Sequence, residues 1–473
     1  MHKKPFRELP DAVLLEPILA PRGSFYYIAL GLLGLSVFGF FAWLRQLRYG
    51  LGVTDLNVPV YWGVYITNFV FFIGISHAGT LISAILRLCD AEWRRSITRA
   101  AEVITVLVLF FGVGSIIMDL GRPDRALNVL RHPNFRSPLL WDVCSISVYL
   151  TASSIYLYLP LIPDLAILRD HGGRHVWFYR LLAAGWQGTE RQKRFLHRAI
   201  SVMAVLVIPI AVSVHTVVSW VFAMTIQPMW HSTIFGPYFV VGAIFSGIAS
   251  LIIAMALIRR IYFLSDYLKD IHFNHLGLLL MVMSLLWFYF TFAEYLTTYY
   301  GGEPAHLVIF YSKLAGRFSW VYWTMILTCF VIPFPILAFR RTRTVTGTVI
   351  AAASVNIGMW LERYTIVVPT MSRPRLPWAQ GNYSPTWVEL GITVGFGATF
   401  IFLYMLFTRF FPIVSVWEVW EGREKALREV VDRIRSYMPG EGPEVKVLSP
   451  EQIVPSAAAT DGNVKSTVKE SYP

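Results

Sequence analysis

Long apolar stretches recur along this chain, and short segments rich in charged and turn-forming residues separate them. A membrane-spanning helix needs about 20 predominantly apolar residues to cross a ~30 Å hydrocarbon core. The stretches predict ten such helices, at 25–44, 58–86, 103–118, 139–162, two within 199–258, 271–293, 318–339, 344–361 and 390–408. Segment 199–258 contains no Asp, Glu, Lys or Arg, and its Gln227-Pro228 and Gly236-Pro237 pairs predict a turn between two helices. The pattern therefore predicts an all-α integral membrane protein.

The polar parts of the chain divide it into three regions. We expect residues 1–24 to form a cytoplasmic N-terminal arm, residues 25–411 the ten-helix transmembrane domain, and residues 412–473 a cytoplasmic tail. From about Trp417 the tail is amphipathic with mixed charges, which predicts a helix, and its Pro, Gly, Ser and Ala-rich remainder predicts a disordered or extended segment. The arm lacks the pattern of a cleavable signal peptide, so we expect the first apolar stretch to remain as a helix.

Composition narrows the class of protein further. Of the 473 residues, 55% are hydrophobic and only 15% are Asp, Glu, Lys or Arg, whereas a soluble domain is nearer a quarter charged. These values exclude a disordered chain and a soluble nucleic-acid-binding protein, although the net charge is +12. Cys89, Cys144 and Cys329 lie in or beside apolar stretches and cannot form a disulfide framework or a cysteine-ligated zinc or iron–sulfur site. We therefore expect no metal site built from cysteines in this chain.

The distribution of Lys and Arg predicts the orientation in the membrane, because short cytoplasmic loops carry an excess of both. Ten spans place the two termini on the same side. Outside the tail, that side carries 21 Lys and Arg and the opposite side carries 11. We therefore predict a multi-pass protein of the bacterial inner membrane with both termini in the cytoplasm.

Ionisable side chains inside the spans are the strongest functional signal, because each is costly in hydrocarbon unless it is paired or faces water. Five of them, from five helices, fall near the midplane or in the outer half: His77, Asp119, Asp142, His215 and Glu294. Each has a structural alternative, since helix-end carboxylates are often solvated and a buried histidine often makes one hydrogen bond. Several proton-exchanging groups around one outer pocket suit a substrate that exchanges protons when it is oxidised or reduced, such as a quinol.

The loop after the third helix adds a second signal. It is the most basic of the outer loops, and its four arginines are Arg122, Arg125, Arg131 and Arg136. They could serve only to bind helix carbonyls and lipid phosphates. The functional alternative is that they dock an acidic extramembrane partner above the pocket.

Four motifs carry a family resemblance: ITNFVFFIGISHAGTLISAILRL in the second helix, DLGRP at the end of the third, NFRSPLLWD before the fourth and SVHTVVSW in the fifth. They resemble the NrfD/PsrC family of quinone-interacting membrane subunits, most closely the ActC subunit of alternative complex III. The resemblance extends from about Pro59 to Gly302. It implies two four-helix bundles, here with two further peripheral helices, and menaquinol or another quinol as the substrate of a respiratory or photosynthetic complex. It also implies no covalently bound or protein-ligated cofactor and no metal in this chain.

The resemblance also implies partners and site residues. The partners are a periplasmic iron–sulfur subunit that receives the electrons, a second NrfD-like membrane subunit, a multihaem cytochrome c and membrane lipid, without nucleic acid. Asp142 falls on the acidic residue of the family's SPLLWD motif. Together with the ionisable residues of the spans, this leads us to expect Asp142, Asp119 and His215 as catalytic residues. The residues expected to bind the quinol are His77, Asp119, Arg122, Trp141, Asp142, His215 and Glu294. Asp119 stands where close relatives are expected to have a histidine, and Val221 where they continue with an aspartate. These departures leave the proton route undetermined.

A proton path from the outer pocket to the cytoplasm is a weaker hypothesis. Its candidate members are His77, Thr80, Ser83, Glu102 and Asn356. Ser and Thr in membrane helices more often bond a carbonyl one turn back than carry protons.

Two other classes of protein stay open on the sequence alone. One is a membrane b-type cytochrome with His77 and His215 as axial ligands, although the paired histidines within single helices that a two-haem bundle usually shows are missing. The other is a secondary transporter, for which Pro209 and the glycines of the third and tenth helices are possible discontinuities.

Overall fold

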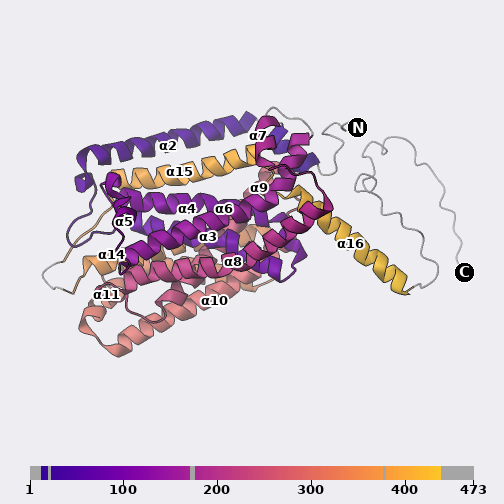
Figure 1. Cartoon of the computed structure of the whole chain (residues 1–473). Helices are drawn as coiled ribbons and strands as arrows, with labels where there is room; N and C mark the ends of the chain where they lie inside the picture. Colours follow the sequence, from indigo (N-terminus) through magenta and orange to yellow (C-terminus); the bar gives the residue numbers. More distant parts are fainter. Residues whose placement is uncertain (1–11, 20–22, 171–175, 376–379, 438–473) are drawn as a thin grey trace, which may run out of the picture.

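The computed structural model describes residues 12–19, 23–170, 176–375 and 380–437, and within them the chain is helical without strands (Figure 1). Ten helices in these ranges are long and apolar enough to cross a membrane, which confirms the predicted number. They are α2 (Gly23–Tyr49), α3 (Val64–Leu88), α4 (Thr98–Asp119), α6 (Pro138–Asp170), α8 (Glu190–Ala223), α9 (Phe235–Tyr262), α10 (Asp270–Gly301), the segment from α12 (Ser319–Ile326) through a π-helical turn (Leu327–Val331) to α13 (Pro333–Ala338), α14 (Val345–Ser372) and α15 (Trp387–Phe410).

The spanning helices form two bundles and a peripheral pair. Helices α3, α4, α6 and α8 pack together as the first bundle, and α9, α10, α14 and the α12–α13 segment form the second. Helix α9 also packs against α3 and so joins the two bundles. Helices α2 and α15 pack against each other and lie side by side along one flank (Figure 1). One continuous apolar core extends through both bundles.

The shorter helices distinguish the two ends of the bundles (Figure 1). Helices α7 (Val176–Leu182) and α16 (Val416–Tyr437) lie at one end, which we call the tail end. Helices α5 (Asn128–Arg131) and α11 (Pro304–Leu314) lie at the opposite end, which we call the loop end. Helix α4 ends and α6 begins at the loop end, so Asp119 and Asp142 both lie there.

Helix α14 differs most from its predicted boundary. The apolar stretch ends at Leu361 because Glu362 and Arg363 follow it, yet the helix continues to Ser372. Both charged side chains are 1% exposed, and Arg363 Nη1 lies 2.9 Å from Glu362 Oε2. Mutual neutralisation of the two charges lets them remain inside the bundle, so the charged pair does not mark the end of the span.

The first turn of α16 is anchored to the tail end of the first bundle. Both carboxylate oxygens of Asp164 accept hydrogen bonds from α16, one from the backbone N–H of Val416 at 3.2 Å and one from that of Trp417 at 3.0 Å. The buried guanidinium of Arg99 pairs with Asp164 and donates to Ser415 Oγ at 3.0 Å. Asp164 thereby satisfies N–H groups that a helix start leaves without partners.

A second ionic contact holds the next turn of α16. Glu418 is 1% exposed and accepts from Arg87 at 2.5 Å, with Arg94 3.5 Å away. Burial by itself would raise the pKa of Glu418, but attraction to Arg87 and Arg94 outweighs burial, so the pKa lies below its ordinary value of 4.5. This contact therefore stabilises the docked helix fully above about pH 4.5 and is lost as the pH falls through the lower, folded-state pKa.

We predict that Glu418→Gln loosens α16 at neutral pH, because it leaves buried arginines without their counter-charge. Amide hydrogen exchange in residues 416–423 should accelerate about 100-fold, which corresponds to about 3 kcal/mol. The wild-type protein should lose the same protection on acidification, whereas the variant should show a flatter dependence on pH. The matched control is Glu424→Gln, which removes an exposed pair with Arg428 on the same helix. Equal exchange profiles for the wild type and Glu418→Gln would contradict the assignment.

Candidate functional site

Asp142 stands out among the carboxylates at the loop end. It lies in the first turns of α6, is 5% exposed, and its Oδ1 has no hydrogen-bond partner among the described residues. A buried polar atom without a partner is costly, and structures rarely keep one that has no role. This oxygen is therefore free to accept a hydrogen bond from a bound molecule.

Asp142 is the first of three polar side chains in a row along helix α6, which we call the polar stripe. Tyr149 and Tyr156 follow Asp142 at seven-residue steps, so the three side chains share one helix face at intervals of about 10 Å. The Tyr149 hydroxyl donates to the carbonyl of Ser76 at 3.0 Å, and the Tyr156 hydroxyl lies 3.2 Å from Ser83 Oγ. The stripe faces α3 inside the first bundle and extends from the loop end toward the tail end.

His77 and His215 meet beside this stripe. Their ring centres are 3.9 Å apart with the planes at 73°, and both side chains are fully buried. Nε2 of His77 lies 2.9 Å from the carbonyl oxygen of Ala211 and therefore carries the proton, while the Tyr149 ring centre is 5.7 Å from that of His77. Neither ring nitrogen of His215 has a partner among the described residues. The structure thus brings together two of the five ionisable residues singled out by the sequence.

The geometry of this pair does not fit haem ligation. Two imidazoles on opposite sides of one metal, each bound at about 2 Å, hold their ring centres farther apart than 3.9 Å and leave room for a porphyrin between them. Nε2 of His77 is occupied by a backbone carbonyl. Within the described ranges, no group of three or more His, Cys, Asp or Glu is arranged to hold a metal ion.

A second polar cluster lies in the second bundle, around Glu362 and Arg363. Arg363 lies within electrostatic range of both His77 and His215, and its guanidinium carbon is 5.0 Å from the centre of the Phe239 ring. A Cβ at position 242 would lie only 2.6 Å from Nη2 of Arg363, so the glycine at this position leaves room for the guanidinium. Arg363 therefore links the histidine pair to the second bundle.

Glu294 lies on the far side of this second cluster, at a small cavity of about 30 Å³ that is large enough for one water molecule. Its lining includes the polar side chains of Tyr238, Thr291, Glu294, Tyr295, Lys313 and Thr365. Lys313, from the loop-end helix α11, is 5% exposed, and burial lowers its pKa to about 8 against the attraction of Glu294 and Glu362. Glu294 and Lys313 therefore line one cavity, and its lining includes neither Asp142 nor the histidine pair.

Asp119 occupies a third environment, toward the peripheral helices. It is half-buried, its Oδ1 has no hydrogen-bond partner among the described residues, and it lies within electrostatic range of Glu389 on α15. Beside it, Gln46 donates to the carbonyl of Met118 at 2.7 Å and accepts from the Tyr65 hydroxyl at 2.6 Å. Asp119 therefore belongs to the contact with the peripheral pair, whereas Asp142 belongs to the first bundle.

The arginines of the loop between α4 and α6 are all exposed. Arg122 pairs with Asp124 at 2.9 Å, while Arg125, Arg131 and Arg136 have no carboxylate within 4 Å among the described residues. Trp141 donates from its indole N–H to the carbonyl of Phe135 at 2.7 Å and so fixes this loop to the start of α6. Large apolar side chains stand exposed among the arginines: Leu127, Leu130 and Phe135. Such a mixture is typical of a surface that binds a protein.

The candidates for a proton path fall into separate groups. At the tail end, Ser83 donates to Glu102 at 2.7 Å, directly below the stripe on α6. Between this contact and His77 lies about 9 Å of α3, and the side chain of Thr80 in that stretch is outside the described residues. Asn356 instead bonds Ser250 at 3.1 Å between α9 and α14. His77, Ser83 and Glu102 therefore line one bundle, and Asn356 lies at a contact between two helices of the other.

Several residues that connect these groups are not evident from the sequence. Glu362 and Arg363 follow an apolar stretch and so indicate the end of a span, and Lys313 falls in a predicted outer loop. Tyr149 and Tyr156 are not among the predicted site residues, although their seven-residue spacing from Asp142 is a usable signal.

Comparisons with known proteins agree with this architecture. Residues 52–374 match the family described as polysulphide reductase, NrfD. The chain is 27% identical over 428 residues, 85% of this chain and 95% of the relative, to a proposed membrane subunit of a dimethyl sulfoxide reductase from Halobacterium salinarum. It is 22% identical to the Hdr-like menaquinol oxidoreductase integral membrane subunit of Archaeoglobus fulgidus, covering 89% of this chain and all of the relative. It is 24% identical to the menaquinone reductase integral membrane subunit of Nitratidesulfovibrio vulgaris, covering 80% of this chain and 90% of the relative. The family match covers well over half of the chain, and this protein therefore belongs to the polysulphide reductase NrfD family.

Proposed function

We propose that this chain is the quinol-binding membrane subunit of an electron-transfer complex of the alternative complex III type. It binds menaquinol at the loop end and supplies no redox cofactor of its own, so the electrons leave to an iron–sulfur subunit docked above. A second NrfD-like subunit and a multihaem cytochrome c complete the complex. Family membership and relatives named for menaquinol and menaquinone chemistry support this proposal. The observation that carries it is the buried, unpartnered Asp142 above the stripe that leads to the histidine pair.

The chemistry follows from the arrangement of acceptors. Oxidation of a quinol to a quinone releases two electrons and two protons, so the site needs proton acceptors while the electrons pass to the partner. Asp142 Oδ1 accepts a hydrogen bond from one quinol hydroxyl and takes its proton as the electrons leave. A ring nitrogen of His215, whose ring contacts that of His77, is the second acceptor, because both nitrogens of His215 lack a partner among the described residues. Arg122 and Trp141 border the pocket at the loop end, whereas Asp119 lies toward the peripheral helices. Glu294 is excluded from this pocket because it lines the separate cavity with Lys313.

The orientation is part of the same proposal. The loop end faces the periplasm of a bacterial inner membrane, and α16 lies in the cytoplasm, in agreement with the excess of Lys and Arg on that side. Protons released at the loop end would then enter the periplasm.

The exposed arginine loop is the proposed docking surface for the iron–sulfur subunit. Reversing Arg125, Arg131 and Arg136 to Glu should at least halve the recovery of that subunit with the purified complex, because attraction to an acidic partner becomes repulsion. The remaining association should weaken further as salt is raised. Arg340→Glu/Arg341→Glu, which changes exposed charges at the tail end, is the control. Full recovery of the iron–sulfur subunit by the triple variant would contradict the docking surface.

The tail-end contact of Ser83 with Glu102 provides a test of proton translocation. In vesicles that contain the complex and receive menaquinol and an outer electron acceptor, the cytoplasm-equivalent side should become alkaline. Glu102→Gln should abolish this change and leave quinol oxidation intact, because it removes the ionisable group nearest the tail end of the stripe. His77→Ala should also abolish it. Unchanged proton movement in both variants would exclude this path.

Neither alternative class gains support from the geometry. The short distance between the rings of His77 and His215 disfavours a b-type cytochrome. Pro209 lies inside the continuous helix α8, so it does not create the helix break that motivated a transporter.

A further inference from the structure

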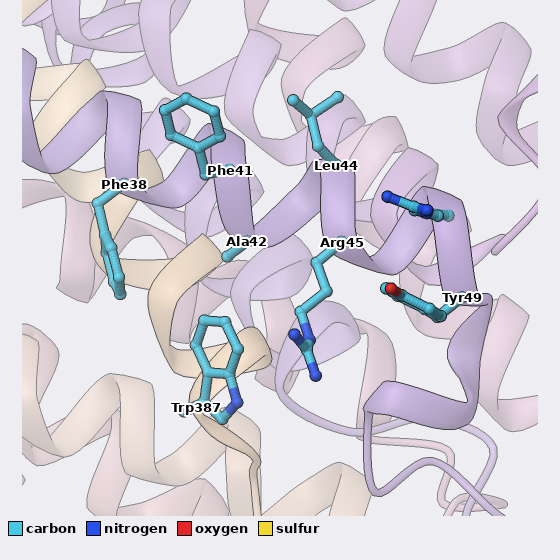
Figure 2. A pocket seen from close by; sticks show the side chains of 8 residues that line it. Phe38, Phe41, Ala42, Leu44, Arg45, Tyr49 and Trp387 are labelled. Carbon is cyan, nitrogen blue, oxygen red and sulfur yellow. The ribbon is translucent and has the colours of Figure 1, made fainter.

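The peripheral helices α2 and α15 cross at glycines and leave a groove beside the crossing. A Cβ on Gly39 would lie 2.6 Å from Cα of Gly395 and 3.0 Å from the carbonyl oxygen of Gly391, so these backbones touch directly. A groove of about 430 Å³ opens toward the loop end of this crossing, lined by Phe38, Phe41, Ala42, Leu44, Arg45, Arg48, Tyr49 and Trp387 (Figure 2). The crossing fixes both walls of the groove.

Two aromatic rings hold an arginine over this groove. The guanidinium carbon of Arg45 lies 5.5 Å from the ring centre of Tyr49 and 5.4 Å from that of Trp387, and Figure 2 shows the side chain extending between these rings. Arg48 lies 5.5 Å from the Tyr49 ring. Cation–π contacts of this kind restrict a guanidinium without using its N–H donors. The groove therefore has two cations whose N–H donors pair with no carboxylate of the described residues, and aromatic rings hold one of these cations in place.

Neither arginine has a carboxylate within 4 Å among the described residues, whereas Arg87, Arg99 and Arg363 each pair with one. Exposed guanidinium donors need acceptors from outside the chain. The acceptor chemistry that fits two neighbouring guanidinium groups is an anionic oxygen group such as a phosphodiester.

The position of the groove identifies the source of that phosphate. Arg45 and Arg48 lie in the last turns of α2 and Trp387 is the first residue of α15, so the cations lie where spanning helices end. Lipid phosphates and belts of Trp and Tyr occupy this level of a membrane. On the other side of Arg45, the exposed side chains of Phe38 and Phe41 line a path toward the hydrocarbon core.

We propose that this groove is a binding site for one anionic phospholipid. Its phosphodiester lies against Arg45 and Arg48, and one acyl chain lies along Phe38, Phe41 and Leu44. The site is independent of quinol binding, because it lies on the peripheral pair rather than inside either bundle.

Native mass spectrometry of the purified complex tests this proposal. Complex exchanged into phosphatidylglycerol should retain one more lipid than the Arg45→Gln/Arg48→Gln variant. Binding should be about 30-fold weaker in the variant, since each of the two basic residues contributes roughly one kcal/mol near a charged membrane surface. Phosphatidylcholine, in which a cationic choline offsets the charge of the phosphodiester, should show a smaller difference in retention between the two proteins. The control is Arg191→Gln, which removes an exposed arginine that stacks on Phe195 and is not part of this groove.

Three outcomes would overturn the proposal. Equal retention of phosphatidylglycerol by wild type and double variant would show that the arginines hold no lipid. Displacement of the lipid by millimolar inorganic phosphate would show a site for the free anion. Loss of a partner subunit from the variant, without loss of lipid, would show that another transmembrane helix occupies the groove.

Discussion

Asp142→Asn should lower the rate of menaquinol oxidation by at least about 100-fold while the complex still assembles. The amide keeps the size and shape of the carboxylate but cannot accept a proton at neutral pH, and a positioned general base typically contributes about 10²- to 10⁴-fold. Asp142 is buried, and no described residue occupies its Oδ1, so the substitution breaks no hydrogen bond of that oxygen within the described part of the chain. The measurement is steady-state quinol oxidation by the purified complex with a soluble electron acceptor.

Two controls distinguish a loss of proton transfer from a general loss of activity. Asp266→Asn, which changes an exposed carboxylate at the tail end, should keep the wild-type rate. The electron acceptor should re-oxidise the reduced redox centres of the partner subunits at the same rate in Asp142→Asn and in the wild type. A rate for Asp142→Asn near that of the wild type would contradict the role of Asp142.

The second large effect is structural and concerns the buried pair of Arg99 and Asp164. Arg99→Leu should destabilise the tail end by about 3–5 kcal/mol, because Asp164 remains buried without its counter-charge. The first turn of α16 should become exposed as well, since the same carboxylate accepts its backbone N–H groups. Thermal unfolding of the solubilised protein and protease sensitivity of residues 412–420 measure these two effects.

Lys193→Gln is the matched control for this pair. It removes an exposed ion pair with Glu190, and such pairs contribute less than about 1 kcal/mol. If Arg99→Leu and Lys193→Gln proved equally stable, the contact around Asp164 would not hold α16.

The spanning helices are predictable because length and apolar character alone decide whether a segment crosses a membrane. The break between α8 and α9 contains no charged residue and is indicated by Gln227-Pro228, which lies in the turn, whereas Gly236-Pro237 falls in the first turn of α9. The predicted end of α14 is too early because the sequence does not reveal that Arg363 neutralises Glu362 inside the fold. The end of α14 therefore depends on the contact between Glu362 and Arg363, which cannot be inferred from composition.

The candidate site is predictable only in part, for a related reason. Depth along a helix predicts His77 near the midplane and His215 in the outer half, whereas the structure places their ring centres 3.9 Å apart. Depth says nothing about which face of a helix a side chain occupies or which helices are neighbours. Asp119 therefore lies toward α15 and Glu294 beside Lys313 on α11, although both lie at the same end as Asp142. The contact around Asp164 joins residues of α4 and α6 to the tail, and no local pattern indicates such pairing.

Photoaffinity labelling of the complex with an azido-menaquinol tests the proposed function most directly. Label should appear in peptides that contain residues 138–149 of α6 and 211–219 of α8, excess menaquinol should prevent it, and Asp142→Asn should reduce it. Protectable label confined to the α2–α15 groove, to the cavity beside Glu294 or to a partner subunit would contradict quinol binding between Asp142 and the histidine pair.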